Sequence, residues 1–252
     1  MAVKPTEYCS RGLVGIGVPQ ANPTVEQEMF ALRPAGLGLV TTRLTSEADD
    51  IEQRLRDYIE HTVEYVHRFD DLAIDAFAIA CTGSSYLLGA QAERDLLQRF
   101  SAKLGYPVIS AAGAISETLA LLGARRIGIV SPYPDWLTEH ANEFWSAAGY
   151  QVAAIRSVQL RGPNVHAIYE LSSADALAAA GELELQDLDA ILFTGTGMPT
   201  LGAIAPLAKS TGLPVMSSNL CLLSAVCRRL GLSSDPLLSL KGSVKNDPLD
   251  GE

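Results

Sequence analysis

One cysteine in this chain directly follows an apolar segment and is itself followed by hydroxyl side chains. The segment covers residues 76–80, and Cys81-Thr82-Gly83-Ser84-Ser85 comes next. If the segment is a strand and the following residues open a helix, the Cys81 thiol lies at a helix N-terminus, which favours the reactive thiolate. We therefore expect Cys81 to be catalytic, with the alternative that it is a small buried residue beside a capping hydroxyl.

A second loop has the composition of an anion-binding turn. Gly195-Thr196-Gly197 also follows an apolar segment, and glycine lets backbone N–H groups approach an oxyanion closely. The same glycines are also typical of a simple tight turn.

Two side chains near prolines could bind a carboxylate. Asn22 lies in the stretch that begins at Pro19, and Tyr133 follows Pro132. Each also has an ordinary interpretation, because Asn-Pro turns and turn tyrosines are common. The predicted site has Cys81 as its catalytic residue and the following substrate-binding residues: Pro19, Asn22, Thr82, Gly83, Tyr133, Gly195, Thr196 and Gly197.

Short apolar segments that alternate with amphipathic ones must position these residues. Apolar runs at 13–18, 37–42, 76–80 and 107–110 are typical of strands buried on both faces of a parallel sheet. Residues 51–69 and 91–104 have the apolar spacing of helices. Ser46 or Asp49 is the expected cap of the first helix, and Gly105 the expected end of the second. This alternation predicts an α/β fold.

The second half of the chain repeats the first. The matched positions are separated by 113, 114 and 107 residues, and they are Pro19 with Pro132, Cys81 with Gly195, and Ser110 with Ser217. The duplication predicts two pseudo-symmetric lobes, each with a mainly parallel four-stranded sheet flanked by helices. Because ligands bind at the carboxyl ends of parallel strands, we expect the active site in the cleft between the lobes. We place lobe one at residues 1–115 plus 216–252 and lobe two at residues 116–215.

The composition disfavours several classes of protein. The 252 residues carry 19 Lys and Arg against 29 Asp and Glu, so the net charge of -10 argues against binding to nucleic acid or anionic lipid. No stretch approaches the ~20 apolar residues of a membrane span, and the N-terminus lacks a secretory signal. We therefore expect a cytoplasmic protein. The four cysteines form no Cys-x-x-Cys pair, which argues against a metal site. Because the expected cytoplasmic compartment is reducing, we expect their thiols to be free.

Five short motifs keep a characteristic order and spacing over residues 14–232. They are Val18-Pro19-x-x-Asn22-Pro23-Thr24, Ala80-Cys81-Thr82-Gly83-Ser84, Ser131-Pro132-Tyr133-Pro134, Gly195-Thr196-Gly197 and Pro214-Val215-x-Ser217-Ser218-Asn219. Together they resemble the Asp/Glu racemase superfamily, in the branch that holds maleate cis–trans isomerases and arylmalonate decarboxylases. The resemblance implies a two-lobed fold, a small dicarboxylate substrate, no cofactor, no metal and a possible homo-oligomer.

The chain departs from the pattern of that superfamily at one position. Racemases place a cysteine at both equivalent strand ends, whereas here Gly195 stands opposite Cys81. Racemisation needs an acid on each face of the stereocentre, so it is disfavoured. The arylmalonate decarboxylases also have one cysteine, but in the second-half position. A cysteine introduced at position 195 is expected to supply the acid on the second face of the stereocentre.

Three functions remain open. In the first, the Cys81 thiolate adds to the C=C bond of a small cis-enedioate such as maleate, the adduct rotates, and elimination gives the trans isomer. In the second, a malonate-type substrate loses CO2 and Cys81 protonates the enediolate. In the third, the chain binds a small acid without turnover. The Asn22 amide favours the isomerase. The sequence assigns no role to His166 or Tyr169.

Overall fold

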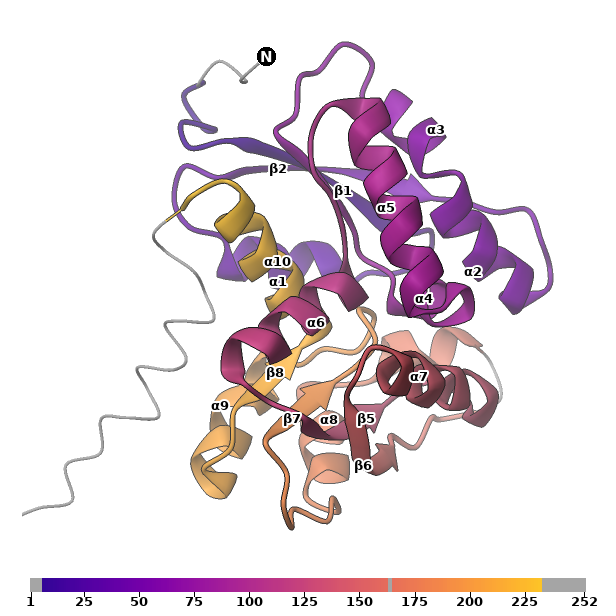
Figure 1. Cartoon of the computed structure of the whole chain (residues 1–252), viewed down its shortest axis with the longest axis vertical. Helices are drawn as coiled ribbons and strands as arrows, with labels where there is room; N and C mark the ends of the chain where they lie inside the picture. Colours follow the sequence, from indigo (N-terminus) through magenta and orange to yellow (C-terminus); the bar gives the residue numbers. More distant parts are fainter. Residues whose placement is uncertain (1–5, 163–164, 233–252) are drawn as a thin grey trace, which may run out of the picture.

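The strands form two sheets of identical topology. We describe a computed structural model, which covers residues 6–162 and 165–232 (Figure 1). The first sheet has the order β2-β1-β3-β4 and the second the order β6-β5-β7-β8, and every pairing is parallel. The strands are β1 (Leu13–Pro19), β2 (Gly38–Leu44), β3 (Ala76–Ile79), β4 (Val108–Ser110), β5 (Arg126–Ser131), β6 (Gln151–Ser157), β7 (Ala190–Phe193) and β8 (Val215–Ser217). The prediction of two parallel four-stranded sheets in an α/β fold is confirmed.

Helices cover the sheets, and this is why the central strands are apolar throughout. All residues of β1, β3 and β7 are buried. The helices are α1 (Val25–Leu32), α2 (Ile51–Glu60), α3 (Thr62–His67), α4 (Thr82–Leu88), α5 (Ala90–Leu104), α6 (Ala111–Leu122), α7 (Asp135–Ala147), α8 (Ser173–Ala180), α9 (Leu201–Thr211) and α10 (Ser218–Arg229), with the 3-10 helix η1 at Val165–Glu170. In the part of the chain that the structure describes, none of them is long and apolar enough to cross a membrane.

The duplication extends to a polar contact at the start of each central strand. Asp75 accepts a hydrogen bond from the backbone N–H of Leu13 at 2.9 Å, where β1 begins. Asp189 accepts one from the backbone N–H of Arg126 at 2.7 Å, where β5 begins. Each carboxylate precedes the third strand of its own sheet and fixes that strand beside the first.

One predicted helix is wrong in its extent and in its cap. Residues 51–69 form two helices, α2 and α3, because the backbone turns at His61 with ψ near 18°. The N-cap is Asp50, whose carboxylate accepts from the backbone N–H of Gln53 at 2.8 Å. Ser46 donates instead to the carboxylate of Asp57 on the helix. The second predicted helix is confirmed as α5, which ends at Gly105 in a left-handed conformation.

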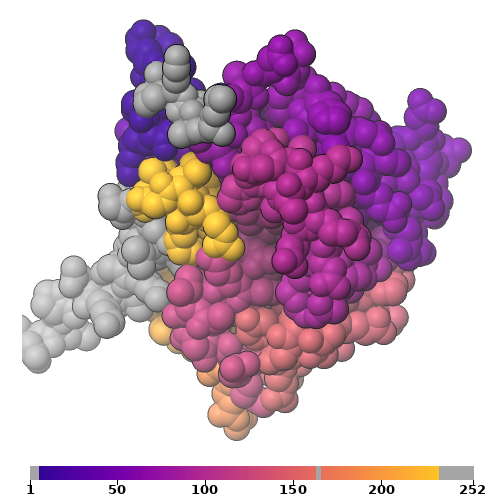
Figure 2. Space-filling view, turned by 45° about the horizontal axis from the view of Figure 1, so that its top comes forward, coloured from indigo at the N-terminus to yellow at the C-terminus, as the bar shows by residue number. Residues whose placement is uncertain are grey.

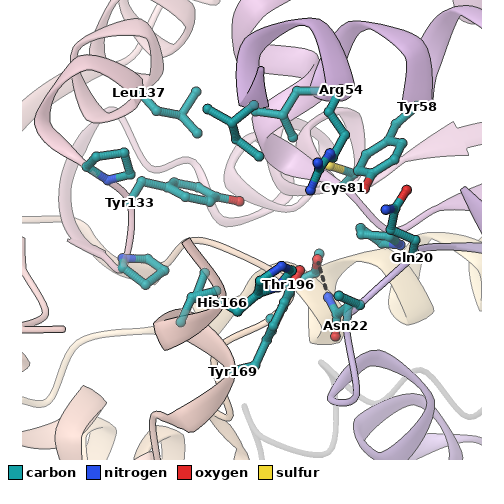
Figure 3. A pocket seen from close by; sticks show the side chains of 18 of the residues that line it. Gln20, Asn22, Arg54, Tyr58, Cys81, Tyr133, Leu137, His166, Tyr169 and Thr196 are labelled. Carbon is teal, nitrogen blue, oxygen red and sulfur yellow. Dashed lines mark hydrogen bonds between the residues drawn. The ribbon is translucent and has the colours of Figure 1, made fainter. Parts of the chain in front are cut away.

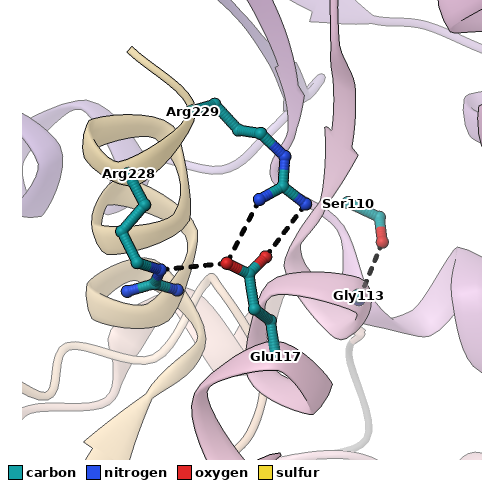
Figure 4. A network of polar contacts seen from close by, with 5 residues as sticks. All are labelled: Ser110, Gly113, Glu117, Arg228 and Arg229. Carbon is teal, nitrogen blue, oxygen red and sulfur yellow. Dashed lines mark hydrogen bonds and ion pairs between the residues drawn. The ribbon is translucent and has the colours of Figure 1, made fainter. Parts of the chain in front are cut away.

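The C-terminal helix returns to the first sheet. Helix α10 packs against α6 and α1, and Figure 2 shows its yellow end beside indigo and magenta segments of the first half. Glu117 on α6 accepts from Arg228 Nε at 2.9 Å and pairs with Arg229 at 3.0 Å (Figure 4). Because β8 ends at Ser217, we propose the second lobe boundary after that residue. The expected lobe-one residues 1–5 and 233–252 lie outside the described part.

A buried carboxylate joins elements from both halves of the chain. Glu28 on α1 is 5% exposed. It accepts hydrogen bonds from the backbone N–H of Thr200 at 2.5 Å and of Leu201 at 3.1 Å, and from Asn219 Nδ2 at 2.8 Å. The negative charge therefore lies at the N-terminus of α9, where the helix dipole stabilises an anion.

We expect Glu28→Gln to lower the free energy of unfolding by about 1–3 kcal/mol, because an amide N–H would face the N–H donors that now point at an oxygen. Denaturant unfolding measures the loss. Glu26→Gln is the matched control on the same helix, since Glu26 pairs with the more exposed Arg43 at 2.7 Å. That variant is expected to lose less than about 1 kcal/mol. Equal losses in the two variants would contradict this interpretation of Glu28.

Candidate active site

A cavity of about 350 Å³ opens where the carboxyl ends of the two sheets meet (Figure 3). It receives residues from the ends of β1, β3, β5 and β7. Six of the nine predicted site residues line it: Pro19, Asn22, Cys81, Tyr133, Thr196 and Gly197. Thr82, Gly83 and Gly195 are buried and are not among the lining residues. The cleft predicted from the duplication therefore exists at the predicted strand ends.

The fold holds the Cys81 thiol at the start of α4. Cys81 is the N-cap residue of that helix, and its side chain is buried. Ser84 Oγ donates to Sγ at 3.2 Å. Burial raises the pKa of the Cys81 thiol, and the hydrogen bonds from Ser84 and from the Gly83 backbone offset this only in part. The expectation that the helix N-terminus lowers this pKa is therefore wrong, because loss of hydration outweighs the nearby donors.

Thr82 positions the hydroxyl of Tyr133. The two hydroxyl oxygens are 2.7 Å apart, and Thr82 is fully buried behind the cavity wall. Burial, together with the nearby Cys81, raises the pKa of Tyr133 well above its usual range. The phenol consequently keeps its proton and can donate a hydrogen bond into the cavity. This contact also joins the two lobes, because Thr82 begins α4 and Tyr133 follows β5.

Asn22 serves both as a turn residue and as a cavity residue. Its Oδ1 accepts from the backbone N–H of Thr24 at 2.9 Å, as an Asn-Pro turn before a helix would require. Its Nδ2 donates to Thr196 Oγ at 3.2 Å. Thr196 in turn donates to the carbonyl of Ala80 at 2.7 Å. The loop after β7 is therefore tied to the residue before Cys81, as the matched strand ends predicted.

Glycine occurs at positions 195 and 197 of the second loop for two different structural reasons. Gly195 has φ of +86°, and a Cβ there would lie 2.7 Å from Pro132 Cγ. The backbone conformation therefore requires glycine at this position. At Gly197, a Cβ would lie 2.6 Å from the ring of Tyr169, so glycine lets that ring pack directly against the loop.

Helix α2 forms a part of the cavity wall that was not predicted from the sequence. Ile51, Arg54, Leu55 and Tyr58 follow helical spacing and all line the cavity. Their apolar members could equally belong to a core face, and only the fold shows that this face borders the cavity. The one signal was Arg54, a charged residue among apolar positions.

His166 and Tyr169, which had no predicted role, also line the cavity from η1. Burial raises the pKa of Tyr169 to about 12, and the proximity of Cys81 adds to the shift. Burial likewise raises the pKa of Tyr58. Three neutral phenols thus surround the thiol, together with the Asn22 amide and the Arg54 guanidinium. Gln20, Trp136 and Leu137 were also missed. Among the described residues, no group of three or more His, Cys, Asp or Glu side chains could hold a metal ion.

This arrangement can bind a small carboxylate beside a thiol. The phenols and the Asn22 amide can donate hydrogen bonds to carboxylate oxygens. The apolar side chains of the wall exclude water, and hydrogen bonds to a charged group are stronger where water is excluded. Cys81 can act there either as a nucleophile or as a proton donor.

Proteins of known activity share the sequence over most of its length. A maleate isomerase of Pseudomonas putida is 25% identical over 243 residues, which cover 92% of this chain and 96% of the relative. The arylmalonate decarboxylase of Bordetella bronchiseptica is 25% identical over 219 residues, which cover 84% and 88%.

Solved structures share the fold. The maleate isomerase of Pseudomonas putida has a TM-score of 0.80 at 24% identity, covering 88% of this chain and 93% of that one. An arylmalonate decarboxylase structure has a TM-score of 0.73 at 22% identity, covering 87% and 92%. The family model described as arylmalonate decarboxylase matches residues 14–238. With nine-tenths of its length matched by that model, the chain belongs to the arylmalonate decarboxylase family.

Proposed function

We propose that this protein catalyses the cis–trans isomerisation of a small cis-enedioate such as maleate, with Cys81 as the nucleophile. The observation that carries the proposal is the position of Cys81, which is the one cysteine among the residues that line the described cavity. Maleate isomerases of Pseudomonas putida and Geobacillus stearothermophilus are 25% and 26% identical to this chain. Both relatives support an enedioate substrate.

The proposed reaction needs one sulfur and no second thiol. The Cys81 thiol first loses its proton to solvent. Its sulfur then forms a bond to one olefinic carbon, while the π electron pair moves into the far carboxylate and makes an enediolate. The former double bond is now a single bond and rotates. When the electron pair returns, the C–S bond breaks and the trans isomer leaves.

A related structure supports a covalent intermediate. A maleate cis–trans isomerase of Nocardia farcinica was solved with a covalently bound succinylcysteine in a variant that has serine in place of one cysteine. An adduct of this kind therefore formed there without the replaced cysteine. In this chain, Gly195 instead of a second cysteine is compatible with the same step at Cys81.

Donors around the thiol are proposed to hold the enediolate. The cavity is lined by Tyr133, Asn22, Thr196, Gly197 and Pro19. Thr82 positions Tyr133 at 2.7 Å. For Gly83 and Gly195 we propose a role in shaping the wall. We further propose a cytoplasmic protein that binds no nucleic acid, uses no cofactor and forms a homo-oligomer.

One observation favours a second function, decarboxylation of a malonate-type acid. Burial keeps the Cys81 thiol protonated, which is the form a proton donor needs. Apolar side chains such as Leu55, Trp136 and Leu137 would accommodate the substituent of an arylmalonate. In this reaction the carboxylate leaves as CO2, the C–C electron pair forms an enediolate, and Cys81 gives that carbon its proton.

The products distinguish the candidate functions. We expect proton NMR of the protein with maleate to show fumarate. A monoacid formed from phenylmalonate, with release of CO2, would favour the decarboxylase. Binding of either acid without any product would support a protein that only binds small acids and would contradict both enzymes.

The pH dependence gives an independent prediction. The raised pKa means that the thiol persists to a higher pH than the ordinary value of 9.0 implies. An isomerase that reacts through the thiolate should gain roughly tenfold in kcat/KM per pH unit below that pKa. A decarboxylase that uses the thiol should instead be independent of pH in the neutral range and lose activity above that pKa. Initial rates between pH 6 and 10 test the sign, and a falling isomerase profile would contradict the thiolate mechanism.

A further inference from the structure

A fixed guanidinium lies in the cavity wall without an acidic partner. Arg54 is half-buried, and Figure 3 shows its side chain directed into the cavity beside Cys81. Its Nε and Nη2 donate to the carbonyl of Ala48 at 3.2 and 2.7 Å. Within residues 6–162 and 165–232, no carboxylate forms an ion pair with Arg54. By contrast Arg56, two residues further along α2, pairs with Glu52 at 2.8 Å.

The geometry leaves part of the guanidinium for a ligand. Two of its nitrogens bind Ala48, so the third, Nη1, can donate to an anion. Arg43, another cation of this region, is already paired with Glu26 at 2.7 Å and donates to the Asn22 carbonyl. A guanidinium held in place loses little conformational entropy when it binds a carboxylate.

The surroundings of Arg54 indicate which carboxylate it would bind. In Figure 3, Tyr133 lies across the cavity from Arg54, and Asn22 lies beside Thr196 on a separate part of the wall. The charge of Arg54 reaches the phenols of Tyr58 and Tyr169, where it partly offsets the effect of burial on their pKa. These phenols keep their protons and are additional donors. Arg54 is the one arginine or lysine among the residues that line the described cavity, so it is the permanent positive charge that a second carboxylate meets there.

We infer that Arg54 binds the second carboxylate of the substrate and makes the site selective for dicarboxylates over their monoamides. The inference rests on the proposed function for its substrate, but not on the chemical step at Cys81. Arg54 is then a specificity-determining residue, and the preferred ligand is a compact four-carbon diacid that reaches both sides of the cavity.

The test compares a diacid with its monoamide. For kcat/KM with maleate and with maleamate, the wild type is expected to prefer maleate. Arg54→Gln should lower kcat/KM for maleate by about 10- to 100-fold, which is the range of a charge-assisted hydrogen bond. The same substitution should lower kcat/KM for maleamate far less. The preference should therefore collapse. Arg54→Lys should restore part of it, and Arg56→Gln should leave it unchanged. If Arg54 only held the loop at Ala48, both substrates would lose activity equally, and the inference would be overturned.

Calorimetry separates this inference from the proposed function. Succinate cannot isomerise, so its binding reports Arg54 without the reaction. We expect Arg54→Gln to bind succinate about 10- to 100-fold more weakly than the wild type and Arg56→Gln do. If succinate binding depends on Arg54 but maleate gives no fumarate, the proposed isomerase function is contradicted and the inference about Arg54 is supported. Fumarate formation with succinate binding unchanged in Arg54→Gln, or a wild type that does not bind succinate, would overturn the inference. The thermal unfolding midpoint of each variant shows that it is folded.

Discussion

Replacing Cys81 by alanine is expected to lower turnover by roughly 10⁴- to 10⁶-fold, the loss seen when an enzyme nucleophile is removed. The sulfur forms the bond that the proposed mechanism requires, and no other cysteine lines the described cavity. The free energy of unfolding should change by only about 1 kcal/mol, since the side chain is small. Initial rates with maleate and denaturant unfolding measure the two effects.

Two variants control this experiment. Cys81→Ser keeps a hydroxyl beside Ser84 but removes the sulfur, and it should be nearly as inactive as the alanine variant. Cys9→Ala removes a cysteine that the structure places away from the cavity, and it should keep wild-type turnover. Substantial activity in Cys81→Ala would show that the thiol is structural.

Substituting Gly195 by cysteine or alanine is expected to lower the free energy of unfolding by about 2–5 kcal/mol. A side chain at φ of +86° costs about 1–2 kcal/mol, and the contact of its Cβ with Pro132 at 2.7 Å adds an overpacking cost of about 1–3 kcal/mol. Denaturant unfolding measures the sum. That a thiol at this position supplies an acid on the second face stays a prediction, and the positive φ of Gly195 means that this variant would also be strained.

Gly105→Ala is the matched control for Gly195→Ala. Gly105 has φ of +79°, and a Cβ there would meet nothing within 4 Å. It should therefore lose the conformational part alone, about 1–2 kcal/mol. If the two alanine variants lost the same amount, the contact with Pro132 would carry no cost, and a cysteine at position 195 would be tolerated after all.

Local patterns predicted the elements that the local sequence controls. The uniformly apolar runs that became β1 and β3 are typical of strands covered on both sides, and Gly105 ended α5 because it adopts the left-handed conformation. The repeat then paired Pro19 with Pro132, and both line one cavity. Pairing strand ends along the chain was enough to place Cys81 in the cleft.

The remainder depends on contacts between distant segments. The break at His61 follows from backbone turns that no strong breaker marks in the sequence. Glu28 finds its partners at Thr200, which lies 172 residues away. The pKa of Cys81 depends on how completely neighbouring helices exclude water. The apolar spacing within residues 51–69 predicts a helix, but a helix face that lines a cavity has the same pattern as one that packs into a core.

The central claim is that the Cys81 sulfur bonds to the substrate. The most direct test is to mix the protein with maleate, quench it rapidly in acid, and map the modified peptide by mass spectrometry. We predict a succinyl adduct on Cys81 that is absent from Cys81→Ala and disappears as fumarate accumulates. Fumarate formation with no adduct on any cysteine, or with the adduct on Cys9, Cys221 or Cys227, would contradict this mechanism.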